Sequence, residues 1–271
     1  EQEFTLNKKR RNILLISEAS AYTVALVGLN QLWYADYPKS SFHFINDNEE
    51  WLQMDKMGHM SASYYTGVAG IKAYEWAGFS RKNAIWYGGM TGSIFLTVIE
   101  VLDGTSEQWG ASSGDLIANT TGSLLAIGQA LKWNEQRIQL KYSYSPSNMA
   151  ANNPEQLGSN HLERALKDYN GQTYWLTLNL KSLLQIENPD FPSWLSLALG
   201  YGADEMVNPY HEEGDAERYR QFLMSFDVDL NKIKTKNKTL NSVLHTFGFL
   251  KFPTPVIQYT NGNIFFHPIY Y

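Results

Sequence analysis

Three pairs of polar residues lie in an otherwise apolar, small-residue-rich stretch between Trp51 and Asn119. The pairs are Asp55 with His59, Glu100 with Asp103, and Asp115 with Asn119, and Lys56 directly follows Asp55. Each pair is spaced by three or four residues, so on a helix both of its members project from one face. The spacing therefore predicts one polar site inside a group of packed helices.

The residue types in these pairs suit metal chemistry. Imidazole and carboxylate groups bind zinc, manganese and related divalent ions, so a divalent metal is the cofactor that the sequence suggests. The candidate metal ligands are His59, Glu100, Asp103 and Asp115, and the candidate catalytic residues are His59, Glu100 and Asp115. A metal that activates a bound water molecule would make the site hydrolytic.

A structural role is the first interpretation of the same residues. In this interpretation Lys56 neutralises one carboxylate, His59 donates to another, and the helices are held in register. The expected polar core network contains Asp55, Lys56, His59, Glu100, Asp103, Asp115 and Asn119. A further alternative leaves part of this set on the surface. Asp115 also has a local explanation, because a helix capped by Ser112 or Ser113 favours a carboxylate in its first turn.

Two other groups of residues are weaker candidates for a functional site. Ser112 or Ser113 could be combined with His59 and an aspartate as a triad, but no nucleophile-elbow motif surrounds the serines. The acidic stretch His211–Asp215 is expected to be a solvated loop, with calcium binding as the alternative. No Walker A, dinucleotide-binding or HExxH motif is present, which argues against nucleotide hydrolysis and zincin chemistry.

Long helices are expected to carry the polar pairs. The pattern predicts helices over about residues 12–34, 49–78, 80–104 and 112–137, with Ser80 as a helix N-cap. Glycine and alanine recur among large apolar residues in these segments, which allows close approach of helix backbones in a membrane or in a tight soluble bundle. Residues 12–34 are long enough to span a bilayer, but Glu18 and Asn30 make them a weak transmembrane segment.

The pattern changes to a period of two after residue 138. Large and small or apolar and polar residues alternate in segments near 138–145, 173–180, 193–203, 220–231 and 256–271. Asn261-Gly262 predicts a type I′ hairpin, and the chain ends in an aromatic residue, Tyr271. Strands of this length and aromatic content are typical of outer-membrane barrels, but five or six of them are too few to close one.

The amino-acid composition indicates a folded protein and excludes sites that depend on cysteine. The 44% hydrophobic content supports a real core, and the net charge of -5 implies no general affinity for nucleic acid. The absence of cysteine excludes disulfides, thiolate metal sites, a cysteine nucleophile and a lipid-modified N-terminal cysteine in this sequence. Because the first residue is Glu1, we expect an exported protein whose signal peptide has been removed.

The polar motifs resemble a known family. The runs Trp51–His59 and Ser113–Gly122, with Glu100 and Asp103 between them, are similar to the DUF2279 (YfiM-like) family of predicted periplasmic proteins. They are also distantly similar to VanZ-like membrane proteins, which share the DK-x-x-H start and a later D-x-x-x-N-x-x-G helix. The resemblance covers about residues 45–130 and implies an envelope protein of a Gram-negative bacterium with no established activity.

The sequence thus predicts an α+β protein. Residues 1–137 form a small-residue-rich bundle of about four long helices, and residues 138–271 supply amphipathic antiparallel strands that do not complete a barrel. The alternative is that the two parts form a single folding unit. We expect a location in the cell envelope, at the outer membrane or its periplasmic face.

The leading functional hypothesis is a non-enzymatic accessory subunit that docks on an outer-membrane assembly, secretion or transport complex. The expected partners are an outer-membrane β-barrel protein or a multi-subunit envelope complex, and membrane lipid. The alternative is a metal-assisted hydrolase or transferase that acts on an envelope lipid or cell-wall component at Asp55, His59, Glu100, Asp103 and Asp115. A soluble periplasmic binding protein is the third hypothesis.

Overall fold

The structure is a computed structural model that describes residues 6–35 and 37–270. Tyr271, the predicted aromatic terminus, lies outside the described residues. The chain divides into two compact units, a helical unit of residues 1–48 with 58–135 and a sheet unit of residues 49–57 with 136–271. The predicted α+β class with an open antiparallel sheet is confirmed.

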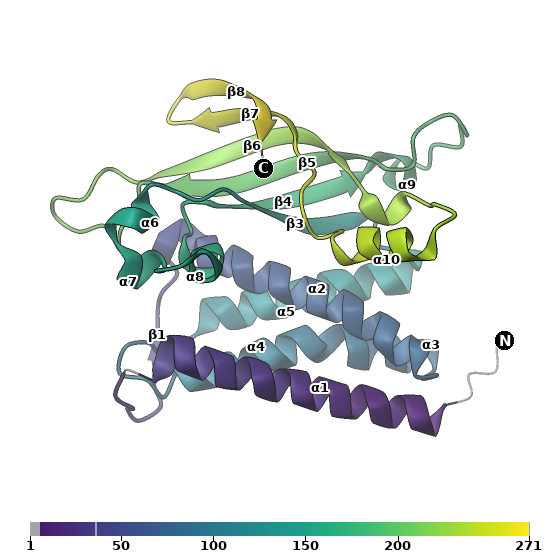
Figure 1. The fold of residues 1–271 in the computed structure, drawn as a ribbon, viewed down its shortest axis with the longest axis horizontal. Coiled ribbons are helices and arrows are strands. Elements are labelled where there is room, and N and C mark those ends of the chain that lie inside the picture. The colour runs from purple at the N-terminus through teal and green to yellow at the C-terminus, as the bar shows by residue number, and fades with distance from the viewer. Residues whose placement is uncertain (1–5, 36, 271) are drawn as a thin grey trace. The chain divides into compact units, whose positions relative to one another are not determined.

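Long helices dominate the helical unit (Figure 1). They are α1 (Lys8–Leu29), continued by a π-helical segment (Asn30–Tyr34), α2 (Met54–Trp76), α3 (Arg81–Asn83), α4 (Gly89–Asp103) and α5 (Ser113–Trp133). A two-residue parallel pair joins β1 (Phe44–Ile45) to β2 (Ala111–Ser112). The predicted number of four long helices is not confirmed, because a π-helical segment, Ala84–Gly88, separates α3 from α4 within the third predicted helix.

Local capping explains where several of these helices begin. Asn7 accepts a hydrogen bond from the Arg10 amide at the start of α1. Ser80 accepts one from the Asn83 amide at the start of α3, as the sequence predicts. Ser112, rather than Ser113, accepts one from the Asp115 amide at the start of α5.

The helix backbones come into direct contact at glycines. A Cβ atom at Gly122 of α5 would overlap the carbonyl oxygen of Met60 on α2. A Cβ at Gly92 of α4 would overlap the backbone of Ser63 on α2. These positions leave no space for a side chain, so the small-residue texture of the sequence reflects helix packing in this unit.

Two helical runs, Lys8–Leu29 and Arg81–Asp103, are long and apolar enough to cross a membrane by length and composition. Buried helices of soluble proteins and signal sequences meet the same criterion. The side chains of Ile16 and Val24 on α1 are mostly exposed.

A tight turn precedes α2. The segment Glu50–Gln53 is a 3₁₀ turn in which Trp51, Leu52 and Gln53 all have positive φ, between 47° and 67°. Non-glycine residues rarely adopt this conformation. The turn is held by contacts within the sheet unit, since the Tyr201 hydroxyl donates to the Leu52 carbonyl (2.5 Å) and the Trp51 amide donates to the Pro209 carbonyl (2.9 Å).

The sheet unit contains a six-stranded antiparallel meander in the order β3-β4-β5-β6-β7-β8 (Figure 1). The strands are β3 (Ile138–Tyr144), β4 (Gln172–Asn179), β5 (Leu195–Asp204), β6 (Tyr219–Val228), β7 (Thr254–Thr260) and β8 (Asn263–Tyr270). At the predicted hairpin between β7 and β8, Asn261 and Gly262 have φ of 48° and 80°, as a type I′ turn requires.

Short helices connect the strands. They are α6 (Met149–Asn152), α7 (Pro154–Leu157), α8 (His161–Lys167), α9 (Leu180–Leu183), a 3₁₀ turn (Leu230–Lys232) and α10 (Lys238–Thr246). One apolar cluster in this unit joins Trp51 and Met54 to Leu157, Tyr174 and Met206. A second cluster lies on the other face of the sheet around Trp175.

Candidate functional site

A buried polar cluster occupies the interior of the helical unit. It contains His59 from α2, Glu100 from α4, and Asp115 and Asn119 from α5. The Nδ1 atom of His59 lies 3.0 Å from Asn119 Oδ1 and 3.9 Å from Glu100 Oε1. Glu100, Asp115 and Asn119 are at most 4% exposed. The structure thus brings together four of the residues that the sequence nominates.

Ser112 organises the carboxylates at the start of α5. Its amide donates to Glu100 Oε2 (2.9 Å), and its hydroxyl donates to Asp47 Oδ1 (2.5 Å) while accepting from the Asp115 amide (3.1 Å). The N-terminus of a helix also favours nearby negative charge. The polar network therefore includes Asp47, which sequence reasoning missed because it lies in a loop without periodicity.

A second layer of hydroxyl groups ties the same helices together. The Ser63 hydroxyl of α2 donates to the Asn119 carbonyl oxygen (2.5 Å) and lies 2.9 Å from the Ser123 hydroxyl. Ser123 in turn accepts from the Ser93 amide of α4 (3.2 Å). Three helices thus share buried hydrogen bonds beneath His59.

Asp103 has a different neighbour from the rest of the predicted network. Its Oδ1 atom accepts a hydrogen bond from the Tyr34 hydroxyl (2.6 Å). Burial, together with the negative charge of Asp103, raises the pKa of Tyr34 well above its ordinary value, so Tyr34 stays a neutral donor. This contact links Asp103 to the segment that follows α1.

Asp55 and Lys56 lie in the first turn of α2, which belongs to the sheet unit. Asp55 Oδ1 accepts from the Tyr169 hydroxyl (2.8 Å), and Asp55 Oδ2 lies 3.3 Å from Lys56 Nζ. Tyr169 also packs on the ring of Trp51. These partners of Asp55 and Lys56 thus lie within the sheet unit.

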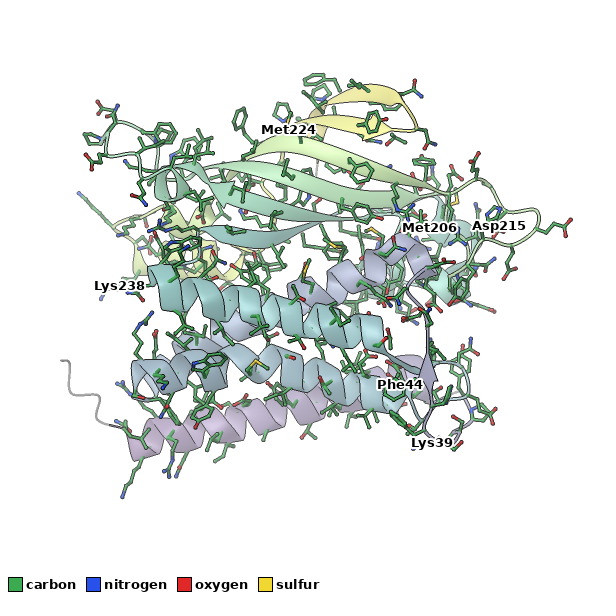
Figure 2. The ribbon with its side chains drawn as sticks, turned by 180° about the vertical axis from the view of Figure 1, so that it is seen from behind. Lys39, Phe44, Met206, Asp215, Met224 and Lys238 are labelled. Carbon is green, nitrogen blue, oxygen red and sulfur yellow. The ribbon has the colours of Figure 1, made fainter. Side chains whose placement is uncertain are left out.

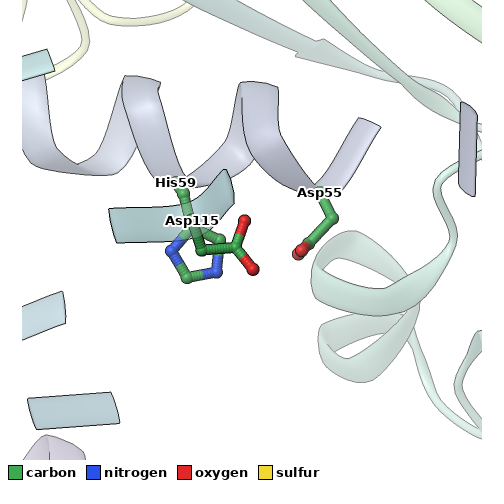
Figure 3. Close-up of side chains that lie close together, drawn as sticks. All are labelled: Asp55, His59 and Asp115. Carbon is green, nitrogen blue, oxygen red and sulfur yellow. The ribbon is translucent and has the colours of Figure 1, made fainter. Parts of the chain in front are cut away.

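His59 and Asp115 offer a nitrogen and an oxygen that lie within 4.8 Å of each other (Figure 3). Asp55 precedes His59 by one turn of α2, so the helix directs both side chains to one face. An imidazole with carboxylates suits a borderline divalent ion such as Zn²⁺ or Mn²⁺. Within the helical unit, His59 and Asp115 are therefore the pair whose donor atoms suit such an ion.

The weaker sequence constellations have simpler explanations. The Ser112 hydroxyl is engaged by Asp47 and by the start of α5, which describes a helix cap. In the acidic loop, Asp215 Oδ2 accepts from the Glu212 amide (3.0 Å), and Glu212 and Glu213 are exposed. Asp215 is labelled in Figure 2. This loop contributes no metal-binding group within the part of the chain that the structure describes.

Residues 43–129 match the family model described as a predicted periplasmic lipoprotein, DUF2279. The predicted resemblance to DUF2279 is confirmed. The match spans less than half of the chain, includes the whole predicted polar network, and ends before β3. It supports a location in the cell envelope, while the similarity to VanZ-like proteins stays a prediction. No curated protein and no solved structure matches the chain.

Proposed function

We propose that this protein is a non-enzymatic structural subunit of the bacterial outer membrane. In this proposal the apolar face of its sheet lies against lipid hydrocarbon, and its last strand joins another outer-membrane β-protein. The observation that carries the proposal is the distribution of side chains on the sheet, which is largely polar on the covered face and apolar on the exposed face.

The covered face of the sheet is rich in polar and small residues. Its buried members include Gln139, Lys141, Ser143, Thr173, Thr177, Asn179, Ser196, Ala198, Ser225, Asp227, Gln258 and Thr260. The segment between β6 and β7 folds over this face, where the Phe252 amide donates to Asp227 Oδ1 (3.0 Å). This face also holds an apolar cluster that includes Trp175, Leu223 and Val256, but it is more polar than the covered face of a sheet in an ordinary soluble core.

Charges are buried on this covered face. Asp227 Oδ2 lies 2.6 Å from Lys141 Nζ, and Asp227 Oδ1 lies 3.7 Å from Lys251 Nζ, with all three side chains fully buried. Lys251 also lies over the ring of Trp175, 5.0 Å from its centre. A polar and charged interior behind an apolar exterior is the arrangement of membrane β-proteins.

The opposite face exposes a continuous series of apolar side chains on β4 to β8. They are Leu176, Leu199, Phe222, Met224, Phe226, Ile257, Tyr259, Ile264 and Phe266, each between 37% and 74% exposed. The register confirms that they are neighbours, since Met224 pairs with Leu199 and Ile257, and Ile257 pairs with Phe266. Met224 is labelled in Figure 2. Patches of this extent mark contact with a membrane or another protein.

The strands β5 and β6 each contain ten residues, the length of a tilted transmembrane strand. Among the described residues, β8 pairs only with β7 and presents its other edge. Its side chains are exposed on both faces, including Ile264, Phe265 and Ile269. Because an open sheet edge is not tolerated in lipid, a lipid-facing sheet requires a partner strand there.

Membrane association tests the first half of the proposal. The purified chain is reconstituted into phospholipid vesicles, which are then washed with sodium carbonate, and the protein is expected to stay with the vesicles. A charged residue at the bilayer midplane costs about 2–4 kcal/mol, so Met224→Arg should release most of the protein. Leu162→Arg, at an exposed apolar residue of α8 outside the sheet, should leave the protein on the vesicles. Release of the wild-type chain by carbonate would contradict the proposal.

Crosslinking tests the second half. A photoreactive amino acid at Phe266 of β8 is expected to crosslink in cells to a partner that mass spectrometry identifies as an outer-membrane β-protein. The same substitution at Phe247, an exposed phenylalanine outside the strands, serves as the control. Equal crosslinking from both positions, or none from Phe266, would count against a strand partner.

A further inference from the structure

Charge is distributed unevenly between the two ends of the strands in the sheet unit. Residues 205–218, which connect β5 to β6, contain five acidic residues and one arginine. Residues 229–253, which connect β6 to β7, contain five lysines and one aspartate. Because these connections lie at opposite ends of β6, Asp215 and Lys238 are at opposite ends of the sheet (Figure 2). The β6–β7 connection therefore concentrates positive charge at one end of the sheet.

Three of the five lysines are exposed at the start of α10. They are Lys234, Lys236 and Lys238, which alternate with threonine and asparagine. In the described part of the chain no carboxylate pairs with them, and the sequence has no acidic residue after Asp229. The backbone amides at the start of α10 are not the source of positive charge, because Asn237 caps them. The ammonium groups of the lysines are therefore the groups that attract an anion here.

α10 exposes an apolar face beside these lysines. Leu240, Val243 and Phe247 are spaced by three and four residues, so they share one side of the helix. Each of them is at least 44% exposed. Leu244 on the same side is partly buried, so the sheet unit covers this face only in part. Helices that combine lysines with an apolar face lie in the plane of a membrane interface, with the apolar side chains at the acyl boundary.

The neighbouring connection at this end of the sheet also exposes apolar side chains. Residues 180–194 connect β4 to β5, and the Asp229 amide donates to the Trp194 carbonyl oxygen (2.8 Å). The side chains of Leu184 and Trp194 are exposed. Tryptophan is enriched at the headgroup level of membranes. Both connections at the basic end of the sheet therefore suit a membrane surface.

We propose that residues 234–247 bind the anionic phosphate headgroups of a lipid surface. The three exposed lysines contact the phosphates, and the apolar face of α10 enters the acyl boundary. A soluble anion or an acidic protein surface would engage the lysines but offers no acyl layer to cover the apolar face. Headgroup binding by α10 does not require the sheet to enter hydrocarbon. The two agree, however, because a ten-residue strand such as β6 that spans a bilayer ends at the headgroups.

Flotation with vesicles tests this binding separately from insertion of the sheet. The full chain carries Met224→Asp, which disfavours insertion without adding positive charge. It is mixed with vesicles of phosphatidylcholine, with or without about one third phosphatidylglycerol, at low and at high salt. We expect binding to the anionic vesicles and its loss at high salt, because salt screens the attraction between exposed charges. Equal affinity for both kinds of vesicle, or binding to neither, would overturn the proposal, whatever the carbonate wash gives for the wild-type chain.

Variants of α10, made in the same Met224→Asp chain, assign the contacts. Lys234→Gln, Lys236→Gln and Lys238→Gln together should weaken binding to anionic vesicles about 100-fold, since each lysine near an anionic surface contributes about fivefold. Phe247→Gln leaves the charges in place and should weaken binding roughly tenfold, because it withdraws apolar area from lipid. Unchanged affinity of Phe247→Gln would contradict a lipid surface and favour a soluble or protein-borne anion.

A matched variant separates local charge from net charge. It replaces by glutamine three exposed lysines of the helical unit, namely Lys9, Lys39 and Lys82. Its affinity for anionic vesicles should stay within about threefold of that of its parent, because these charges lie outside the proposed binding surface. Circular dichroism checks that the variants are folded. An equal loss of binding in both triple variants would assign the effect to net charge and overturn the role of α10.

Discussion

Lys251 is a fully buried lysine that shares one carboxylate, Asp227, with a second buried lysine, Lys141. Its ammonium group also donates to the carbonyl oxygens of Phe226 and Phe252, which satisfies its protons but does not neutralise its charge. Burial lowers the pKa of Lys251 from 10.5 to about 8, against the opposing attraction of Asp227. At the scale of single residues, the buried positive charge of Lys251 therefore destabilises the folded sheet unit.

This electrostatic penalty predicts a pH dependence of stability. Because the unfolded chain holds the Lys251 proton more tightly than the folded chain, the free energy of unfolding should rise between about pH 8 and pH 10.5. The penalty is fully present below pH 8, and on the order of 1–3 kcal/mol is relieved across this window. Denaturant titrations between about pH 7.5 and 9.5 measure the rise. Lys251→Met should lack it, and equal slopes in both proteins would contradict the assignment.

The two adjacent serines at the start of α5 provide a second residue-scale prediction. Ser112 is buried and joins Glu100, Asp47 and the Asp115 amide, whereas Ser113 is exposed. Ser112→Ala removes a helix cap and a donor to a buried carboxylate, so it should lower the free energy of unfolding by about 1–3 kcal/mol. Ser113→Ala should change it by less than about 0.5 kcal/mol. Equal effects in urea denaturation would refute the role of Ser112.

At the scale of elements, contact between helix backbones organises the helical unit. Gly122 and Gly128 both lie on α5, but only Gly122 faces the α2 backbone, while a Cβ at Gly128 would meet nothing within 4 Å. Close packing thus requires a glycine at position 122 of this helix but not at position 128. The sequence alone does not distinguish these two glycines.

Alanine substitutions test this difference between the two glycines. Gly122→Ala should force α2 and α5 apart and lower the free energy of unfolding by about 1–3 kcal/mol or more. Gly128→Ala should raise it by up to about 1 kcal/mol, because alanine favours the helix and meets no clash. Thermal unfolding of both variants beside the wild type gives the comparison. A stabilising effect of Gly122→Ala would show that these helices do not pack as described.

The sequence predicts the elements better than it predicts their environment. Alternation identifies the strands and the Asn261-Gly262 turn, because a period of two and a type I′ dipeptide are local signals. It cannot say which face is covered, since Ser225 and Met224 alternate equally well in either orientation. The turn before α2 depends on distant contacts to Tyr201 and Pro209, so no local signal predicts its positive φ angles.

The polar cluster shows the same limit. Helical spacing nominates His59, Glu100, Asp115 and Asn119, and helix packing brings them together. It also nominates Asp103, whose carboxylate instead accepts from Tyr34, and it misses Asp47, which reaches Ser112 from a loop. Spacing along a helix defines a shared face, but the residue opposite that face is determined by the packing of other segments.

At the scale of the whole molecule, this envelope protein has two distinct parts. The helical unit holds a buried polar cluster and most of the segment that matches DUF2279, namely residues 43–48 and 58–129. The sheet unit holds buried charges on one face and exposed apolar side chains on the other. Because of this second feature, we propose that the exposed face of the sheet lies in lipid.

Spin labelling tests this claim most directly, because the chain has no cysteine and accepts single labelled cysteines without background. Nitroxides are placed at Met224 and Phe226 on the exposed face of β6, and at Leu162 on α8 as an exposed control. In phospholipid vesicles, the account predicts that the labels on β6 collide more with oxygen, which concentrates in hydrocarbon, than with a water-soluble nickel reagent. Leu162 should show the reverse. Strong nickel collisions at Met224 and Phe226 would contradict a lipid-facing sheet.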